Sequence, residues 1–81
     1  MQDKVVVMSG ATSGIGRVAA AKLAAMGARI VLIARDRTRG DDTLSELRAI
    51  APGAGHAVHY ADLSRLADIR RVGAEIAAAE S

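Results

Sequence analysis

Apolar residues change their spacing along this chain in a regular order. Three short, nearly continuous apolar runs, rich in β-branched residues, alternate with longer segments in which apolar residues recur at every third or fourth position. Short continuous runs are typical of strands buried on both faces of a parallel sheet, and the wider spacing is typical of amphipathic helices. The pattern therefore predicts strands over residues 4–8, 29–34 and 56–61.

A helix is predicted after each strand. The first begins near Gly14 and ends at Gly27, because glycine readily takes the left-handed conformation that closes a helix. Its apolar stripe, at three- and four-residue steps, consists of Ile15, Val18, Ala19, Leu23 and Met26. We expect this stripe to pack against the sheet, with Met8 of the first strand and Met26 as core residues.

The remaining two helices complete a regular alternation. The second helix is predicted over 36–51, where the sequence is mostly polar, and the segment 52–55, PGAG, ends this helix. Its apolar side consists of Leu44, Leu47 and Ala51. We expect Ser64 to cap the last helix, whose apolar stripe consists of Leu66, Ile69, Val72 and Ile76. The order β-α-β-α-β-α predicts an α/β, Rossmann-like fold in which parallel strands are joined by right-handed crossovers.

Composition and charge argue against several classes of function. The chain has no Cys, and His56 and His59 lie on opposite faces of the predicted third strand, so we expect no metal site. A single Tyr disfavours base stacking, and a net charge of +2 without a basic stripe disfavours nucleic-acid binding. No apolar run is long enough to cross a membrane. The N-terminal MQDK lacks the plan of a secretion signal, so we expect a cytoplasmic protein.

Three glycines, Gly10, Gly14 and Gly16, lie where the first strand runs into the first helix. A helix N-terminus presents unpaired N–H groups and the positive end of the peptide dipoles, which favour an anion by about 0.3–1 kcal/mol for the dipole alone. Glycine also lets a diphosphate approach the backbone without meeting a Cβ atom. The spacing predicts a dinucleotide-phosphate loop, and the alternative is a tight turn that binds nothing.

Two other phosphate-binding motifs do not fit these glycines. The loop of nucleotide triphosphatases ends in Gly-Lys-Ser/Thr, whereas Gly16 is followed by Arg17 and Val18. The G-x-G-x-x-G fingerprint would need a second glycine where Thr12 stands. The loop is therefore of a different type.

The segment 9–16, SGATSGIG, closely resembles the T-G-x-x-x-G-I-G loop of the classical short-chain dehydrogenase/reductase family. Two later motifs, ARD at 34–36 and DL at 62–63, agree with that family in order and spacing. The resemblance implies that residues 1–81 are the N-terminal part of a single NAD(P)-binding Rossmann domain. It also implies that Asp62 accepts a hydrogen bond from the adenine amino group and that Leu63 contacts the ring. The residues implied to contact the ribose and the diphosphate are Gly10, Ser13, Gly14, Ile15 and Gly16.

Arg35 favours NADP over NAD as the cofactor. In NAD-binding members of the family an acidic residue near the end of the second strand binds the adenosine ribose, and that position is Ala34 here. The neighbouring arginine can form a bidentate pair with the 2′-phosphate of NADP. The alternative is that Asp36 turns inward and favours NAD. We expect the other nearby arginines to face solvent: Arg17, Arg37 and Arg39.

The family's catalytic residues are not found in this chain. Its Tyr-x-x-x-Lys motif would need Lys where Ser64 stands, so Tyr60 is not assigned to catalysis. The resemblance implies an NADP-dependent oxidoreductase that transfers hydride between nicotinamide and a small-molecule carbonyl or alcohol. Its catalytic residues would lie downstream, and the full-length form would be a homo-oligomer. The alternatives are a non-catalytic dinucleotide-binding module and a non-functional truncated fragment.

The predicted elements amount to the three-stranded half of a doubly wound sheet. In such a sheet the fourth strand lies beside the first. Because the sequence stops where that strand would begin, we expect residues 5–8 to form an exposed apolar edge, which is an aggregation hazard. We therefore expect the 81-residue chain to be poorly stable alone.

Overall fold

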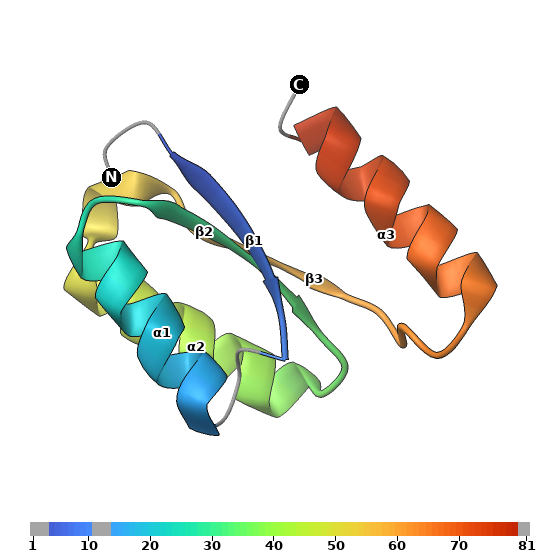
Figure 1. The fold of residues 1–81 in the computed structure, drawn as a ribbon, viewed down its shortest axis with the longest axis horizontal. Coiled ribbons are helices and arrows are strands. Elements are labelled where there is room, and N and C mark those ends of the chain that lie inside the picture. The colour runs from blue at the N-terminus through green and yellow to red at the C-terminus, as the bar shows by residue number, and fades with distance from the viewer. Residues whose placement is uncertain (1–3, 11–13, 80–81) are drawn as a thin grey trace.

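The computed structural model describes residues 4–10 and 14–79, and it confirms the predicted alternation of strands and helices (Figure 1). The elements are β1 (Val5–Ser9), α1 (Gly14–Ala25), β2 (Arg29–Ala34), α2 (Arg37–Ile50), a short 3₁₀ helix (Pro52–Ala54), β3 (Ala57–Tyr60) and α3 (Leu66–Ala79). Gly27 has a φ of 93°, which confirms it as the left-handed residue that follows α1.

The three strands form one parallel sheet in the order β1-β2-β3, as expected for half of a doubly wound fold. Val7 pairs with Val31, and Val31 pairs with Ala57, so these three residues share one face of the sheet. α1 and α2 lie against one face and α3 lies on the other (Figure 1). We call these the α1/α2 face and the α3 face.

The hydrophobic core lies on the α1/α2 face. Ile30 and Leu32 of β2 belong to one cluster with Leu47 of α2, and all three are at most 1% exposed. Ala20 and Ala24 of α1 are buried in the same cluster, where their small side chains allow the helix to lie close to the sheet. Full burial of a large aliphatic side chain contributes about 1.5–3 kcal/mol, so this cluster is the main hydrophobic support of the fold.

The apolar stripe predicted for α1 is largely wrong. Its exposed members are Ile15 (89%), Val18 (56%) and Met26 (57%). Leu23 packs against the core as predicted, beside Ala20 and Ala24, and Met8 of β1 is confirmed as a core-packing residue. α1 is so rich in alanine that more than one of its faces is apolar. Close packing selects the face with the smallest side chains, and this leaves the larger residues outside.

The apolar run of β1 predicted a strand buried on both faces, and this prediction is wrong. Val5 and Val7 are each 48% exposed on the α3 face, because α3 packs mainly on β3. In the described part of the sheet β1 is an edge strand, which matches the expected exposed edge. Only part of the apolar stripe predicted for α3 is buried. Val72 is buried, whereas Leu66 and Ile69 are 61% and 44% exposed.

A buried histidine joins two neighbouring strands. The N–H of Ile30 donates to Nδ1 of His56 at 2.9 Å, at the start of β2 and just before β3. Burial, with smaller contributions from nearby arginines, lowers the pKa of His56. The ring is therefore neutral near pH 7, as its role as an acceptor requires.

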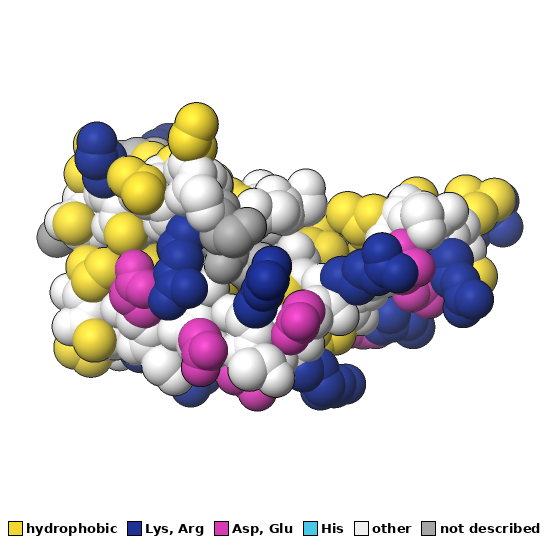
Figure 2. Space-filling model, turned by 90° about the horizontal axis from the view of Figure 1, so that it is seen from below, with side chains coloured by type: hydrophobic (Ala, Val, Ile, Leu, Met, Phe, Trp, Pro, Cys, Tyr) yellow, Lys and Arg dark blue, Asp and Glu magenta, His cyan; other side chains and the backbone are white. Residues whose placement is uncertain are grey.

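The outer surface of the helices is charged and mixed. On the side of the molecule seen in Figure 2, Lys and Arg side chains are interspersed with Asp and Glu side chains. Interspersed charges of both signs are typical of a solvent-facing surface. Within residues 4–10 and 14–79, none of the helices combines the length and the apolar character that a bilayer span requires.

Candidate dinucleotide site

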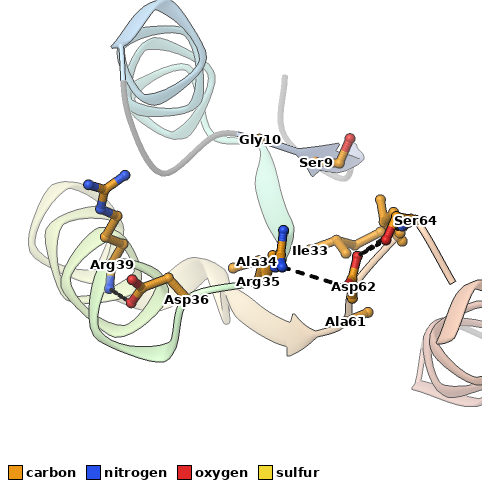
Figure 3. Close-up of a pocket in the computed structure, with 11 residues that line it drawn as sticks. Ser9, Gly10, Ile33, Ala34, Arg35, Asp36, Arg39, Ala61, Asp62 and Ser64 are labelled. Atoms are coloured by element: carbon orange, nitrogen blue, oxygen red, sulfur yellow. Dashed lines mark hydrogen bonds and ion pairs between the residues drawn. The ribbon is translucent and has the colours of Figure 1, made fainter.

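A cleft of about 750 Å³ lies at the carboxyl ends of the strands (Figure 3). Ser9 and Gly10 line it from the end of β1, Ile33 and Ala34 from the end of β2, and Ala61 from just beyond β3. This is the edge of a parallel α/β sheet at which ligands bind. The predicted site residues that the cleft brings together are Gly10, Arg35, Asp62 and Leu63.

The turn between β1 and α1 requires glycine for its backbone conformation. Gly10 and Gly14 have φ values of 69° and 59°. A Cβ atom on either would meet nothing within 4 Å in the described structure, so the space beside this backbone is open. Gly14, Ile15 and Gly16 form the first turn of α1, which holds no acidic residue. Its unpaired N–H groups fit an anion such as a diphosphate, whereas Ser13 lies outside the described residues.

Arg35 stands at the mouth of the cleft, just after β2. Its side chain is 81% exposed, and its Nη2 lies 3.8 Å from Oδ2 of Asp62. An exposed ion pair of this kind contributes about 0–1 kcal/mol. The guanidinium can therefore exchange Asp62 for a more strongly charged partner at little cost.

Asp36 borders the cleft, but its carboxylate is turned toward α2 (Figure 3). Its Oδ1 accepts the N–H of Arg39 at 3.1 Å and caps the helix. Loss of such a cap typically costs about 0.5–2 kcal/mol. The helix cap thus opposes the alternative in which this carboxylate turns inward to a ribose.

Asp62 is held by the residue two positions further along the chain. Its Oδ1 accepts from the backbone N–H of Ser64 at 3.0 Å and from the Ser64 hydroxyl at 2.6 Å, while Oδ2 faces Arg35. These hydrogen bonds, that of the hydroxyl first, lower the pKa of Asp62, so the group is an ionised acceptor near pH 7. The prediction that Ser64 caps α3 is wrong: α3 begins at Leu66, so Arg65 stands at the N-cap position, and the Ser64 hydroxyl donates to Asp62.

Ser64 and Arg39 are among the lining residues that the sequence did not assign to the site. The spacing of Asp62 and Ser64 is that of an Asx turn, in which an aspartate side chain binds the backbone two residues on. That signal could have identified Ser64. Nothing comparable marks Arg39, because arginines on polar helices are ordinarily solvated.

The three arginines expected to face solvent have different surroundings. Arg17 donates from Nε and Nη2 to Oε2 of Glu46, at 2.9 and 2.6 Å, and thereby links α1 to α2. The guanidinium of Arg37 lies 4.5 Å from the centroid of the Tyr60 ring. Arg39 is exposed and lines the cleft. The expectation is wrong for Arg17, and it missed the ring beside Arg37 and the cleft beside Arg39.

Tyr60 and His59 lie outside the lining of the cleft and serve the fold. The Tyr60 hydroxyl donates to Asp41 and lies 3.2 Å from the carbonyl oxygen of Arg37. Nδ1 of His59 lies 3.3 Å from Oε1 of Glu75 on α3. Among the described residues, no group of three His, Cys, Asp or Glu side chains is arranged to hold a metal ion.

The chain is similar to proteins of one family in both sequence and structure. The sequence profile described as short chain dehydrogenase matches residues 4–80. Retinol dehydrogenase 12 of Mus musculus is 42% identical over 67 residues, which make up 83% of this chain and 21% of that protein.

Two solved structures share the arrangement of strands and helices. Levodione reductase superposes with a TM-score of 0.84 and 31% identity, over 94% of this chain and 30% of that one. A metagenomic short-chain oxidoreductase in complex with NADP has a TM-score of 0.83 and 38% identity, over 96% of this chain and 34% of that one. The chain therefore spans between 21% and 34% of the length of these three proteins.

Proposed function

The chain belongs to the short-chain dehydrogenase/reductase family, and we propose that it forms the dinucleotide-binding part of an NADP-dependent oxidoreductase. The observation that carries this proposal is the cleft, where Arg35 stands at the mouth while the carboxylate of Asp36 caps α2. A guanidinium suits a charged phosphate, whereas an available carboxylate would suit ribose hydroxyls. The NADP complex of a metagenomic relative supports the same choice.

Each predicted site residue has one task in this proposal. The residues of the turn receive the ribose and diphosphate: Gly10, Ser13, Gly14, Ile15 and Gly16. Asp62 accepts from the adenine amino group through Oδ2, because its Oδ1 is already held by Ser64. Leu63, which is 39% exposed in the cleft, packs beside the adenine ring. Arg35 leaves Asp62 and binds the 2′-phosphate.

For the whole protein we propose hydride transfer between nicotinamide and a small-molecule carbonyl or alcohol. The bound nicotinamide supplies or takes up the hydride, and this chain's residues bind and orient the adenosine half of the cofactor. The proteins to which the chain is similar are named for retinol and levodione, which supports an alcohol or carbonyl as the substrate class. We place the protein in the cytoplasm, in keeping with the absence of Cys, and expect a homo-oligomer.

Replacing Arg35 tests the choice of cofactor. In the intact protein, Arg35→Ala is expected to weaken NADPH binding about ten- to a hundredfold, because hydrogen bonds to charged groups contribute about 1.5–3 kcal/mol. Binding of NADH, which lacks the phosphate, is expected to stay the same. Both affinities are measured by calorimetric titration.

The matched control is Arg70→Ala, which removes an exposed arginine of α3 that does not line the cleft. This variant should bind both cofactors as the unmodified protein does. An equal loss of NADPH and NADH affinity in Arg35→Ala would contradict the phosphate role. Tighter binding of NADH than of NADPH by the unmodified protein would contradict the choice of NADP.

A further inference from the structure

A histidine side chain closes the amino end of the β2–β3 pair. The parallel register of the two strands begins at Val31 and Ala57. One residue earlier along each strand, the N–H of Ile30 donates to Nδ1 of His56 at 2.9 Å. The His56 ring therefore takes the place of a backbone acceptor and holds the segment before β3 against the central strand of the sheet.

The His56 ring is enclosed, and it can accept this bond only while it is neutral. The residue is 3% exposed. Because Nδ1 accepts, the single ring proton is on Nε2, which is buried and has no hydrogen-bond partner among the described residues. A protonated ring would carry a second N–H at Nδ1, directed at the N–H of Ile30. Both ring donors would then be buried without an acceptor, which is costly.

The charges around His56 also oppose its protonation. Among the described residues, the charged side chains that act on the ring are Arg29 of β2 and Arg48 of α2, and no carboxylate lies within ion-pair distance of it. Burial, and then these two arginines, lower the pKa of His56 from 6.5. The contribution of the neutral ring to stability is therefore fully present above pH 6.5, and it is lost as the pH falls from there through the lowered pKa.

We propose that His56 is an acid-sensitive latch, which holds the amino ends of β2 and β3 together when neutral and releases them when Nδ1 takes up a proton from solvent. The N–H of Ile30 then turns to water. The bond from Nε of Arg29 to the carbonyl oxygen of Gly55, at 2.8 Å, keeps the released segment nearby, so the opening is local. The latch lies at the opposite end of the strands from the cleft, and the inference does not depend on the proposed function.

The test follows amide hydrogen exchange of Ile30 and Leu32 by NMR in the intact protein. Each rate is compared with that of an unstructured peptide at the same pH, which removes the ordinary effect of pH on exchange. Between pH 7.5 and 5.5 the protection of Ile30 should fall several-fold, and at most about tenfold, because the protonated fraction of an opened histidine rises by about that factor. Protection of Leu32, two residues further along β2, should change less.

Three variants separate the latch from other effects of acid. His56→Asn supplies an amide oxygen that can accept from Ile30 but does not titrate, so Ile30 should stay protected at both pH values. His56→Leu removes the acceptor and should leave Ile30 weakly protected at both. The matched control is His59→Gln, which removes the other histidine of the chain and should keep the pH response of the unmodified protein.

Three outcomes would overturn the inference. The first is equal protection of Ile30 at pH 7.5 and 5.5 in the unmodified protein. The second is an equal fall at Ile30 and Leu32, because acid would then act on the whole fold. The third is a fall at Ile30 that persists in His56→Asn or His56→Leu, because another group would then be titrating. A circular dichroism melt of each variant monitors folding, and either His56 variant alone is sufficient for the comparison.

Discussion

The two faces of the sheet are held in different ways. On the α1/α2 face, Ile30, Leu32 and Leu47 are at most 1% exposed and form one continuous cluster. On the α3 face, Val5 and Val7 stay 48% exposed, although they alternate along β1 with Met8, which packs against the core. The layer formed by α1 and α2 therefore supplies most of the hydrophobic stability of this chain, while α3 is attached over a smaller area.

Polar contacts carry much of the attachment of α3. Val72 is the buried residue of α3. Nη2 of Arg71, the residue before it, donates to the carbonyl oxygen of Tyr60 at 2.8 Å. Glu75 binds Arg71 and lies 3.3 Å from Nδ1 of His59. The bond from Arg71, and then that from His59, lowers the pKa of Glu75, so the carboxylate stays ionised near pH 7. The Arg71–Glu75 pair lies within α3, so only the contacts of Arg71 with Tyr60 and of Glu75 with His59 reach the strand. Partly exposed contacts of this kind contribute little each, so α3 depends on them together with Val72.

The largest contrast is expected between truncations of a large aliphatic side chain in each of the two helix layers. Leu47→Ala should lower the free energy of unfolding by about 2–5 kcal/mol, because it leaves a cavity in the closed core. Ile69→Ala should lower it by less than about 1 kcal/mol, because Ile69 on α3 is already 44% exposed. Both values come from urea denaturation of the intact protein. Equal losses would show that the two faces are equally well packed and that the comparison is wrong.

Glycine substitutions give a second, smaller contrast. Gly40→Ala on α2 should destabilise the protein by about 1–3 kcal/mol, because its Cβ would lie 2.7 Å from Cε1 of Tyr60 and 3.1 Å from Cβ of Ala34. Gly73→Ala on α3 should stabilise it by up to about 1 kcal/mol, because nothing lies within 4 Å and alanine favours the helix.

Thermal melts of both variants measure this contrast. The hydrogen bond from the Tyr60 hydroxyl to Asp41 holds the ring in place, so it cannot swing aside for the new methyl group. In a Tyr60→Leu background, where the ring is absent, the penalty for Gly40→Ala should become smaller. A stabilising effect of Gly40→Ala in the unmodified protein would mean that α2 shifts freely over β3.

The elements could be predicted from the sequence because each depends on local pattern. The β-branched runs gave strands within one residue of those observed, and Gly27 marked the end of α1. The burial of individual side chains could not be predicted, since it depends on which surface meets which. Val18 and Ala20 are both apolar residues of α1, yet one is 56% and the other 0% exposed.

The residues of the candidate site also fall into those that the sequence predicted and those that it did not. Gly10 and the pair of Asp62 and Leu63, which line the cleft, could be predicted because they belong to short motifs whose order and spacing resemble those of a known family. Ser64 was missed although its spacing from Asp62 is a local turn signal, whereas Arg39 could not be placed because its position beside the cleft depends on the packing of α2 on β3. Residues placed by tertiary contact leave little trace in a single sequence.

Tyr60 offers the finest test of the comparison, because it contacts both layers. Its hydroxyl donates to Asp41 of α2, whereas its carbonyl oxygen accepts from Arg71 of α3. Burial, and then Asp41, raise the pKa of Tyr60 from 10.0 to about 12. The folded state favours the neutral phenol, so this contribution to stability is present below pH 10.0 and is lost as the pH rises towards about 12.

The titration is followed by the isotope-labelled ring-carbon resonance of Tyr60, which is assigned by its absence in Tyr60→Phe. Asp41→Ala should lower the pKa but leave it above 10.0, because burial remains after the hydrogen bond is gone. Arg71→Ala should leave it unchanged, because the bond from α3 reaches only the carbonyl group. A shift in Arg71→Ala as large as that in Asp41→Ala would mean that α3 controls the packing of Tyr60. The two faces would then be parts of one tightly coupled core.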